Sequence, residues 1–461
     1  MSKSNWIRAF APISSYELLK AAKETEKWIS GFGREVDGGM CWEIIPGEET
    51  PETILLGDRS LYSGAAGIVI FYLRLYLATG EQEYLDKAGK GIDFIIANYK
   101  GNEDFKSDSP LSGCDIGHLG GPTGGAFASE LLYEITNENK YREFAIKVTD
   151  DLIAAANVEE DNLTWTGQYG IIGEGGLVLY LVYAYETLGD ERYLEAAVKA
   201  GNFIADKAEA APGGGYRWYA MPTDTFPTLG AKPGGYFPGF FYGTAGSSYI
   251  LATIAAHTGD ERFLDIAKGG AEYILNIADY SEDGEAALVR YNDPLANDLY
   301  YLGMCQGPVG VSRLFFRLFE ITGEDKYKDF VIKLTNGILA AGAPKVHSPG
   351  YWRTYSYCCG AAGMLEHFIS VYRITDDHLY LNAAYDAAET LIGESYEDET
   401  GRRWYTAWNR HEPHTAQAFA GLYVGSTGVA SSFVLLYELL QNNINYPGYI
   451  EDPFFESKVQ K

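Results

Sequence analysis

The chain has 461 residues, of which 36 are Lys or Arg and 63 are Asp or Glu, giving a net charge of −27. This acidic excess disfavours nucleic acid and anionic membranes as partners, because both repel a negative surface. It favours solubility through self-repulsion and leaves a basic peptide open as a partner. The N-terminus shows no charged segment followed by an apolar one, so we expect no export signal, no membrane insertion and a cytoplasmic protein.

The first predicted element is an amphipathic helix over residues 14–31, where Ser14 and Glu17 fit a capping box. A G-x-x-G element then recurs seven times, with these glycine pairs: Gly64/Gly67, Gly121/Gly124, Gly173/Gly176, Gly243/Gly246, Gly307/Gly310, Gly360/Gly363 and Gly425/Gly428. In the first six copies an aromatic residue lies twenty positions after the first glycine: Tyr84, Tyr141, Tyr193, Phe263, Tyr327 and Tyr380. Six identical spacings indicate an internal repeat.

Each copy predicts a hairpin of two helices. The run after the glycines is almost wholly apolar over twelve to fourteen residues, which is too short to span a bilayer and is typical of a buried helix. The stretch after each aromatic residue is amphipathic instead. In residues 83–99, for example, Leu85, Ala88, Ile92 and Ile95 form a helical apolar stripe.

The repeat predicts an all-α fold, an α/α toroid of seven inner and seven outer helices. The numbers of inner and outer helices are equal if the helix over 14–31 packs against the last inner helix, near residues 428–440. An open solenoid would need polar capping repeats, and the terminal copies are as apolar as the middle ones. We therefore expect one domain over residues 1–461, with a C-terminal tail at 442–461.

Three of the five cysteines occupy related positions in adjacent copies. Cys305 and Cys358 each lie two residues before the first glycine of their copy, and Cys359 follows Cys358. Equivalent positions in a ring point to a common centre, which the inner helices approach with their partly positive N-termini. Three converging sulfurs without an oxidising context indicate a metal, most simply zinc. Cys41 and Cys114 have no equivalent partner, and we interpret them as ordinary thiols.

The hairpin repeat, with Cys-x-Gly in its fifth copy and Cys-Cys-Gly in its sixth, resembles the lanthionine synthetase C (LanC-like) family from about Leu61 to Leu440. The resemblance implies a toroid with Zn²⁺ at its mouth, held by Cys305, Cys358 and Cys359. Cys359 stands where the family more often has a histidine. The implied activity is carbon–sulfur bond formation, in which a peptide thiol adds to dehydroalanine or dehydrobutyrine and closes a thioether ring. The resemblance also implies a dehydratase as partner.

The acid–base residues usual in the family's cyclases are not matched. Tyr242 stands in place of a histidine before the fourth element, and no aspartate lies just upstream of the third. Gln306 and Tyr301 also replace residues common in cyclases. From position alone, the candidate catalytic residues are Tyr242, Glu174 and His118.

Each of these candidates has a structural alternative: packing for Tyr242, a helix-dipole partner for Glu174, and a hydrogen-bonding role for His118. Further candidates lie in the return loops. His411 and His414 are interpreted as substrate contacts or as residues that order their loop, and Arg353 and Arg410 as groups that bind a carboxylate or carbonyl.

The sequence leaves three functions open. The first is a zinc-dependent enzyme that adds thiols to a peptide or small electrophile. The second is a non-catalytic LanC-like protein that binds a thiol such as glutathione, favoured by the missing acid–base residues. The third is a carbohydrate-active toroid, with sugar stacking on four tryptophans expected at the mouth: Trp165, Trp218, Trp352 and Trp404. No matched carboxylate pair supports this third reading.

Overall fold

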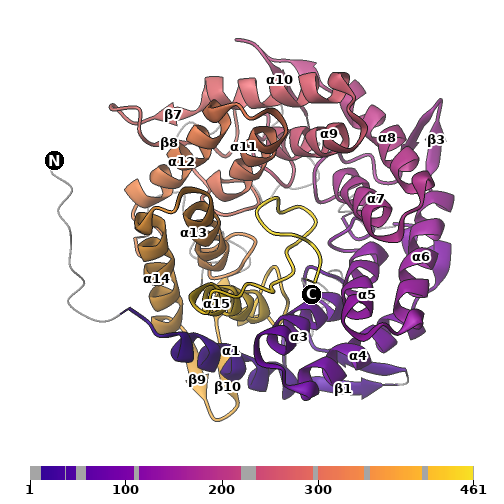
Figure 1. The fold of residues 1–461 in the computed structure, drawn as a ribbon, viewed down its shortest axis with the longest axis vertical. Coiled ribbons are helices and arrows are strands. Elements are labelled where there is room, and N and C mark those ends of the chain that lie inside the picture. Colours follow the sequence, from indigo (N-terminus) through magenta and orange to yellow (C-terminus); the bar gives the residue numbers. More distant parts are fainter. Residues whose placement is uncertain are drawn as a thin grey trace.

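The computed structural model describes residues 12–36, 38–47, 59–107, 114–219, 235–293, 299–346, 354–407 and 414–459. Within these ranges fourteen α-helices form two concentric rings (Figure 1). The inner ring consists of α3 (Ala65–Thr79), α5 (Pro122–Thr136), α7 (Glu174–Leu188), α9 (Thr244–Thr258), α11 (Pro308–Thr322), α13 (Ala361–Thr375) and α15 (Ser426–Leu440). The outer ring consists of α1 (Ser15–Ser30), α4 (Gln82–Ala97), α6 (Asn139–Ala154), α8 (Glu191–Asp206), α10 (Glu261–Ile277), α12 (Asp325–Ala340) and α14 (His378–Gly393). The predicted α/α toroid is confirmed.

The two ends of the repeat meet where α1 packs against α15. The predicted capping box begins α1: the Glu17 N–H donates to Ser14 Oγ at 3.3 Å, and the Ser14 N–H donates to Glu17 Oε2 at 2.9 Å. Helix α1 thus supplies the outer helix that the last inner helix would otherwise lack.

Close backbone contacts explain the G-x-x-G elements. In every copy, a Cβ added to the second glycine would overlap a carbonyl oxygen five or six residues earlier. At Gly246 this is the carbonyl oxygen of Phe240, and at Gly310 that of Met304. The first glycine precedes the helix with φ between −99° and −130° in all seven copies, outside the left-handed region that favours glycine. In the six copies from the second to the seventh, a Cβ on this glycine would lie 2.0–2.7 Å from a neighbouring atom, so lack of space favours glycine there too.

The outer helices pack on the inner ring through the repeated aromatic residues. All six are buried near the start of their helix, from Tyr84 in α4 to Tyr380 in α14. The inner helix before each of them ends at a residue in the left-handed backbone conformation. This residue is Gly at four positions and Asn137 or Asp376 at the other two. These turns account for the constant spacing of the repeat.

Short antiparallel β-hairpins, which the sequence did not predict, lie in the return loops. They are β1 (Gly33–Val36) with β2 (Gly39–Trp42), β3 (Asn157–Glu159) with β4 (Asn162–Thr164), β5 (Glu209–Ala210) with β6 (Tyr216–Arg217), β7 (Asp279–Tyr280) with β8 (Ala287–Leu288), β9 (Tyr396–Asp398) with β10 (Gly401–Arg403), and β11 (Tyr405–Ala407) with β12 (Ala416–Ala418). A 3₁₀ helix, η1 (Gly101–Phe105), follows α4. Strands β2, β4, β6, β8 and β10 each pack on an outer helix.

Three of the four tryptophans expected at the mouth are buried against outer helices instead. Trp165 Nε1 donates to the Leu152 carbonyl of α6 at 2.8 Å. Trp218 and Trp404 make the equivalent bonds to α8 and α14, at 2.8 and 2.7 Å. A buried indole must find such a hydrogen-bond partner, and the last turn of an outer helix offers unpaired carbonyls. The expectation that these three residues face the mouth was therefore wrong, and Trp352 lies outside the described residues.

In the described part of the chain, no helix is long and apolar enough to cross a membrane. The inner helices are apolar because protein surrounds most of their length, and their last turns are only partly buried.

The glycine contacts predict a large difference between two Gly→Ala substitutions. Gly246→Ala should lower the free energy of unfolding by about 1–3 kcal/mol, because the new methyl group overlaps the Phe240 carbonyl. Gly393→Ala, at the end of α14 where an added Cβ meets nothing within 4 Å, should change it by less than about 1 kcal/mol. Urea unfolding of both variants measures this, and equal effects would refute the packing explanation.

Candidate metal centre

A series of backbone hydrogen bonds joins the hairpins at the N-terminal end of the inner helices. The residues involved lie two positions before the first glycine of each copy, and we call them the belt: Tyr62, Leu119, Ile171, Phe241, Cys305, Cys358 and Tyr423. Five bonds link six of them: Phe241 N–H to Cys305 O (2.7 Å), Cys305 N–H to Cys358 O (3.1 Å), Cys358 N–H to Tyr423 O (2.9 Å), Tyr423 N–H to Tyr62 O (2.9 Å) and Tyr62 N–H to Leu119 O (2.8 Å). At the seventh position the bond comes from the next residue, with the Ile172 N–H donating to Phe241 O at 3.3 Å. The belt holds equivalent residues of successive copies next to one another.

The belt brings the three predicted sulfur atoms together. Cys359 Sγ lies 3.2 Å from Cys305 Sγ and 3.4 Å from Cys358 Sγ, and all three sulfurs lie within 4.8 Å of one another. Gly303 allows this approach, because a Cβ there would lie 2.5 Å from the Cys359 carbonyl carbon and oxygen. Cys305 and Cys358 are buried, and Cys359 is partly exposed.

Hydrogen bonding within the triad separates the thiol pKa values. Burial opposes ionisation of Cys358, yet hydrogen bonds from Cys305, Cys359 and Tyr62 outweigh it and hold the Cys358 pKa well below its usual range. Hydrogen bonding to Cys358 raises the pKa of Cys305, and bonding to Cys305 and Cys358 raises that of Cys359. Negative charge in the triad therefore concentrates on Cys358.

The donor set fits a thiophilic metal ion. With Zn–S bonds of about 2.3 Å, tetrahedral geometry places sulfurs about 3.8 Å apart, so small side-chain rotations would accommodate zinc. Among the described residues this is the one group of three or more His, Cys, Asp or Glu side chains placed to bind a metal. Cys41 and Cys114 form no disulfide and lie outside this group.

Two tyrosines lie against the triad. Tyr242, predicted from its position, has a pKa that burial raises well above the usual range. The nearby thiols of Cys305, Cys114, Cys358 and Cys359 raise this pKa further. Tyr62 was not singled out from the sequence, although its place in the belt is equivalent to those of Cys305 and Cys358. That shared place was the signal that could have identified it.

Glu174 and His118 make other contacts. Glu174 is fully buried and accepts hydrogen bonds from the Trp165 N–H at 2.6 Å and from the Thr166 N–H and hydroxyl, both at 2.7 Å. It thereby fixes the loop before α7, and burial is the main cause of its raised pKa. Catalytic use of Glu174 stays a prediction, and so does its alternative role as a helix-dipole partner.

His118 lies in the wall between α5 and α7. Its ring stacks on Tyr180 at 5.7 Å between centroids and meets Phe127 edge-on at 5.9 Å, while Nδ1 lies 3.3 Å from Thr123 Oγ1. Burial lowers the pKa of His118 to about 3, so the ring is neutral at physiological pH. A catalytic role for it is likewise untested.

The other residues singled out from the sequence lie partly in the core and partly in loops. Gln306 is buried, and both polar atoms of its amide lack a hydrogen-bond partner. Tyr301 stacks on Tyr291 with ring centroids 4.6 Å apart. His414 is exposed. Arg353, Arg410 and His411 lie outside the described residues.

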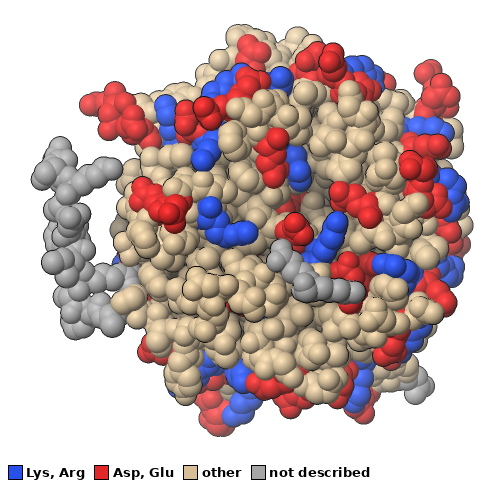
Figure 2. All heavy atoms as spheres, in the orientation of Figure 1, with Lys and Arg blue, Asp and Glu red and all other residues tan. Residues whose placement is uncertain are grey.

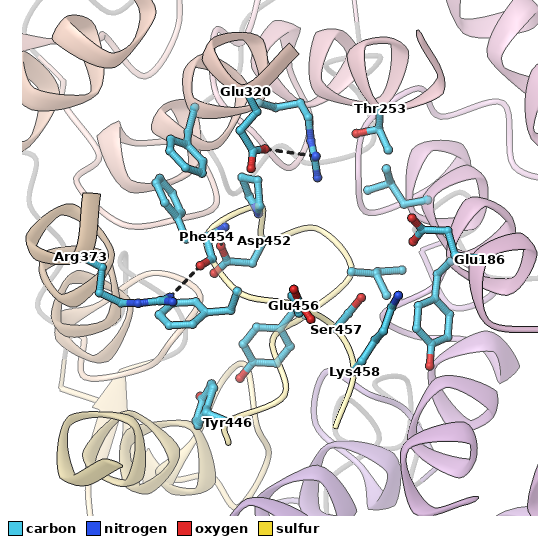
Figure 3. Close-up of a pocket in the computed structure, with 18 of the residues that line it drawn as sticks. Glu186, Thr253, Glu320, Arg373, Tyr446, Asp452, Phe454, Glu456, Ser457 and Lys458 are labelled. Atoms are coloured by element: carbon cyan, nitrogen blue, oxygen red, sulfur yellow. Dashed lines mark hydrogen bonds and ion pairs between the residues drawn. The ribbon is translucent and has the colours of Figure 1, made fainter. Parts of the chain in front are cut away.

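A cavity with a volume of about 910 Å³ lies at the opposite end of the inner helices. Figure 3 shows Glu186, Thr253, Glu320 and Arg373 around it, with the C-terminal tail in the middle. On this face Figure 2 shows a central hollow bordered by charged side chains of both signs. The triad lies at the N-terminal ends of the same helices, about 20 Å away for a fifteen-residue helix, so this cavity is separate from it.

The described geometry agrees with comparisons to known proteins. A model of the lanthionine synthetase C-like proteins matches residues 56–449. The chain belongs to this family. Glutathione S-transferase LANCL1 of Danio rerio is 20% identical over 413 residues, covering 87% of this chain and 85% of that protein.

Comparison with solved structures also found similar folds. Nisin cyclase aligns with a TM-score of 0.59 at 17% identity, over 85% of this chain and 90% of its own. A sugar epimerase from a ruminal bacterium aligns with a TM-score of 0.49 at 14% identity, over 94% of this chain and 100% of its own.

Burial of His118 makes the stability of the protein depend on pH in a defined direction. Unfolded histidine has a pKa of about 6.5, and the folded His118 pKa is about 3, so between these values the unfolded state binds one more proton. The free energy of unfolding therefore falls as the pH is lowered through this window, by about 1.4 kcal/mol per pH unit for one such residue. His118→Phe should remove that part of the slope in urea titrations between pH 6 and pH 4.5. An unchanged slope would contradict the assignment.

Proposed function

We propose that Cys305, Cys358 and Cys359 bind one Zn²⁺ ion and that this LanC-like protein adds a thiol to a dehydroamino acid in a peptide. The observation that carries the proposal is the meeting of three thiols from adjacent hairpins, without a fourth His or Cys ligand among the described residues. A catalytic zinc site keeps such a position open for its substrate, whereas a structural site is closed by four protein ligands.

The donor set suits sulfur chemistry. Bound zinc would lower the pKa of a substrate thiol and hold it as a thiolate. In the addition, a bond forms between sulfur and the β-carbon of the dehydroamino acid, and the C=C electron pair moves towards the carbonyl. The α-carbon then takes a proton, so a thiol S–H has added across the double bond and nothing leaves.

The protein groups next to the triad can assist with hydrogen bonds. The Tyr242 hydroxyl, protonated at neutral pH, would donate to the carbonyl oxygen on which charge develops. Tyr62 donates to Cys358 and would help orient that ligand. No group on the chain suggests dehydration chemistry, so the proposal includes a separate dehydratase that supplies the dehydroamino acid. We further propose that residues 1–461 act as one LanC-like domain in the cytoplasm.

A second candidate is a non-catalytic protein that binds a thiol compound at the same zinc centre. The contacts of Glu174 and His118 favour it, because both side chains are occupied in holding loops and helices. The relative named as a glutathione transferase suggests glutathione as the thiol. The carbohydrate alternative has lost its main support, since the described tryptophans are buried.

Metal analysis and a thiol-addition assay test the proposal. Purified protein should contain about one zinc per chain, and Cys358→Ser should lose it. Cys41→Ser provides a matched control, because Cys41 is a buried cysteine outside the triad. With a dehydroalanine peptide and a thiol, wild type and Cys41→Ser should form the thioether, and Cys358→Ser should not exceed the uncatalysed rate. Zinc without any rate above background would favour the binding protein, and protein without zinc would refute both.

A further inference from the structure

The C-terminal tail runs into the middle of the ring. Figure 1 shows it in yellow, and Figure 3 places Tyr446, Asp452 and Phe454 within the circle of inner helices. Phe454 stacks on Phe316 of α11 with ring centroids 4.4 Å apart, and its carbonyl accepts a hydrogen bond from Arg373 at 2.8 Å. The tail is therefore part of the core and not an appendage.

A buried arginine joins the tail to the inner ring. Arg313 of α11 is only 3% exposed. Its Nη2 donates to Asp452 Oδ2 at 3.1 Å and to the Tyr357 hydroxyl at 2.5 Å, and its Nη1 lies 3.4 Å from Glu451 Oε1. The Tyr423 hydroxyl donates to the same Glu451 oxygen at 2.6 Å. One cluster thus holds two acidic residues of the tail and two tyrosine hydroxyls.

Both tyrosines adjoin a cysteine of the triad. Tyr357 immediately precedes Cys358 in the chain. The Tyr423 carbonyl accepts the Cys358 N–H in the belt at 2.9 Å. Their rings also contact each other, with centroids 5.2 Å apart. The backbone of Cys358 therefore lies between two residues whose side chains are fixed by the tail.

Attachment of the tail does not by itself require this cluster. Arg74 of α3, fully buried, already binds the tail through the Pro447 carbonyl and the Tyr449 hydroxyl, both at 2.8 Å. A buried ion cluster is weak as a source of stability, because desolvation offsets most of the attraction. Groups that orient metal ligands, by contrast, commonly change metal affinity 10–100-fold when they are removed.

We propose that Glu451 and Asp452 of the tail, acting through Arg313, Tyr357 and Tyr423, position Cys358 for metal binding. The tail would thereby support the metal centre from the side of the ring opposite to the three sulfur atoms. This inference rests on the proposed zinc site but not on the proposed reaction, so it can be tested in protein that shows no thioether formation.

The test removes the two hydroxyl groups and keeps the rings. The double variant Tyr357→Phe/Tyr423→Phe keeps the ring contacts with Tyr449 of the tail but removes the hydrogen bonds that link Arg313 and Glu451 to these two residues. We expect its zinc dissociation constant, measured by competition with a chromophoric chelator, to rise at least tenfold. The cobalt(II)-loaded variant should also show shifted ligand-field bands, because the geometry of the sulfur ligands changes.

Tyr449→Phe is the matched control. Tyr449 is a buried tyrosine of the tail whose hydroxyl accepts a hydrogen bond from an arginine, but it does not adjoin a cysteine of the triad. This variant should lose stability without a change in zinc affinity or in the cobalt spectrum.

Equal zinc affinity in wild type and the double variant would overturn the inference and leave the zinc site intact. An equal loss in Tyr449→Phe would also overturn it, by showing that the tail acts only through general stability. Wild-type protein that binds no zinc would overturn the site and this inference together.

Discussion

The structure depends on how closely the backbones of neighbouring hairpins approach at one end of the ring. Glycine in both positions of the G-x-x-G element lets each inner helix begin against a carbonyl oxygen of its own loop, and the belt then links that loop to the next copy. These contacts fix the register of one hairpin against another. Two cysteines at the same place in adjacent copies must therefore become neighbours, and the third follows one of them directly. The sulfur triad is thus a consequence of the repeat, placed where seven helix N-termini converge.

The opposite end of the ring has a different organisation. Here the tail fills part of the centre, and the 910 Å³ cavity lies beside it. Two buried arginines, Arg74 and Arg313, bind the backbone and side chains of the tail. Because Arg313 also binds Tyr357, the two ends of the ring are connected by direct contacts. Among the described residues, Tyr62 and Tyr242 lie against the triad, and their hydroxyl groups can donate hydrogen bonds there.

Much of the fold and of the metal centre could be predicted from the sequence, because equal spacing in a repeat implies equivalent positions in space. The hairpins, the toroid, the helix that closes the ring and the convergence of Cys305 with Cys358 and Cys359 all follow from equal spacing. Tyr62 was missed because a tyrosine, among 36 in the chain, carries no chemical signal without the belt. The tryptophans were misplaced because their indole N–H groups bind helix ends that only the fold brings near. The contacts of Glu174 and of the tail depend on loop conformations and distant partners, which periodicity does not determine.

X-ray absorption at the zinc K-edge tests the central claim most directly, on protein purified in a buffer without added thiols. If the triad binds zinc with one open position, the spectrum should require about three sulfur neighbours near 2.3 Å and one nitrogen or oxygen neighbour. A shell of four sulfurs would show a closed site, and a shell with only nitrogen and oxygen would show that the cysteines do not bind the metal. Either result would contradict the account.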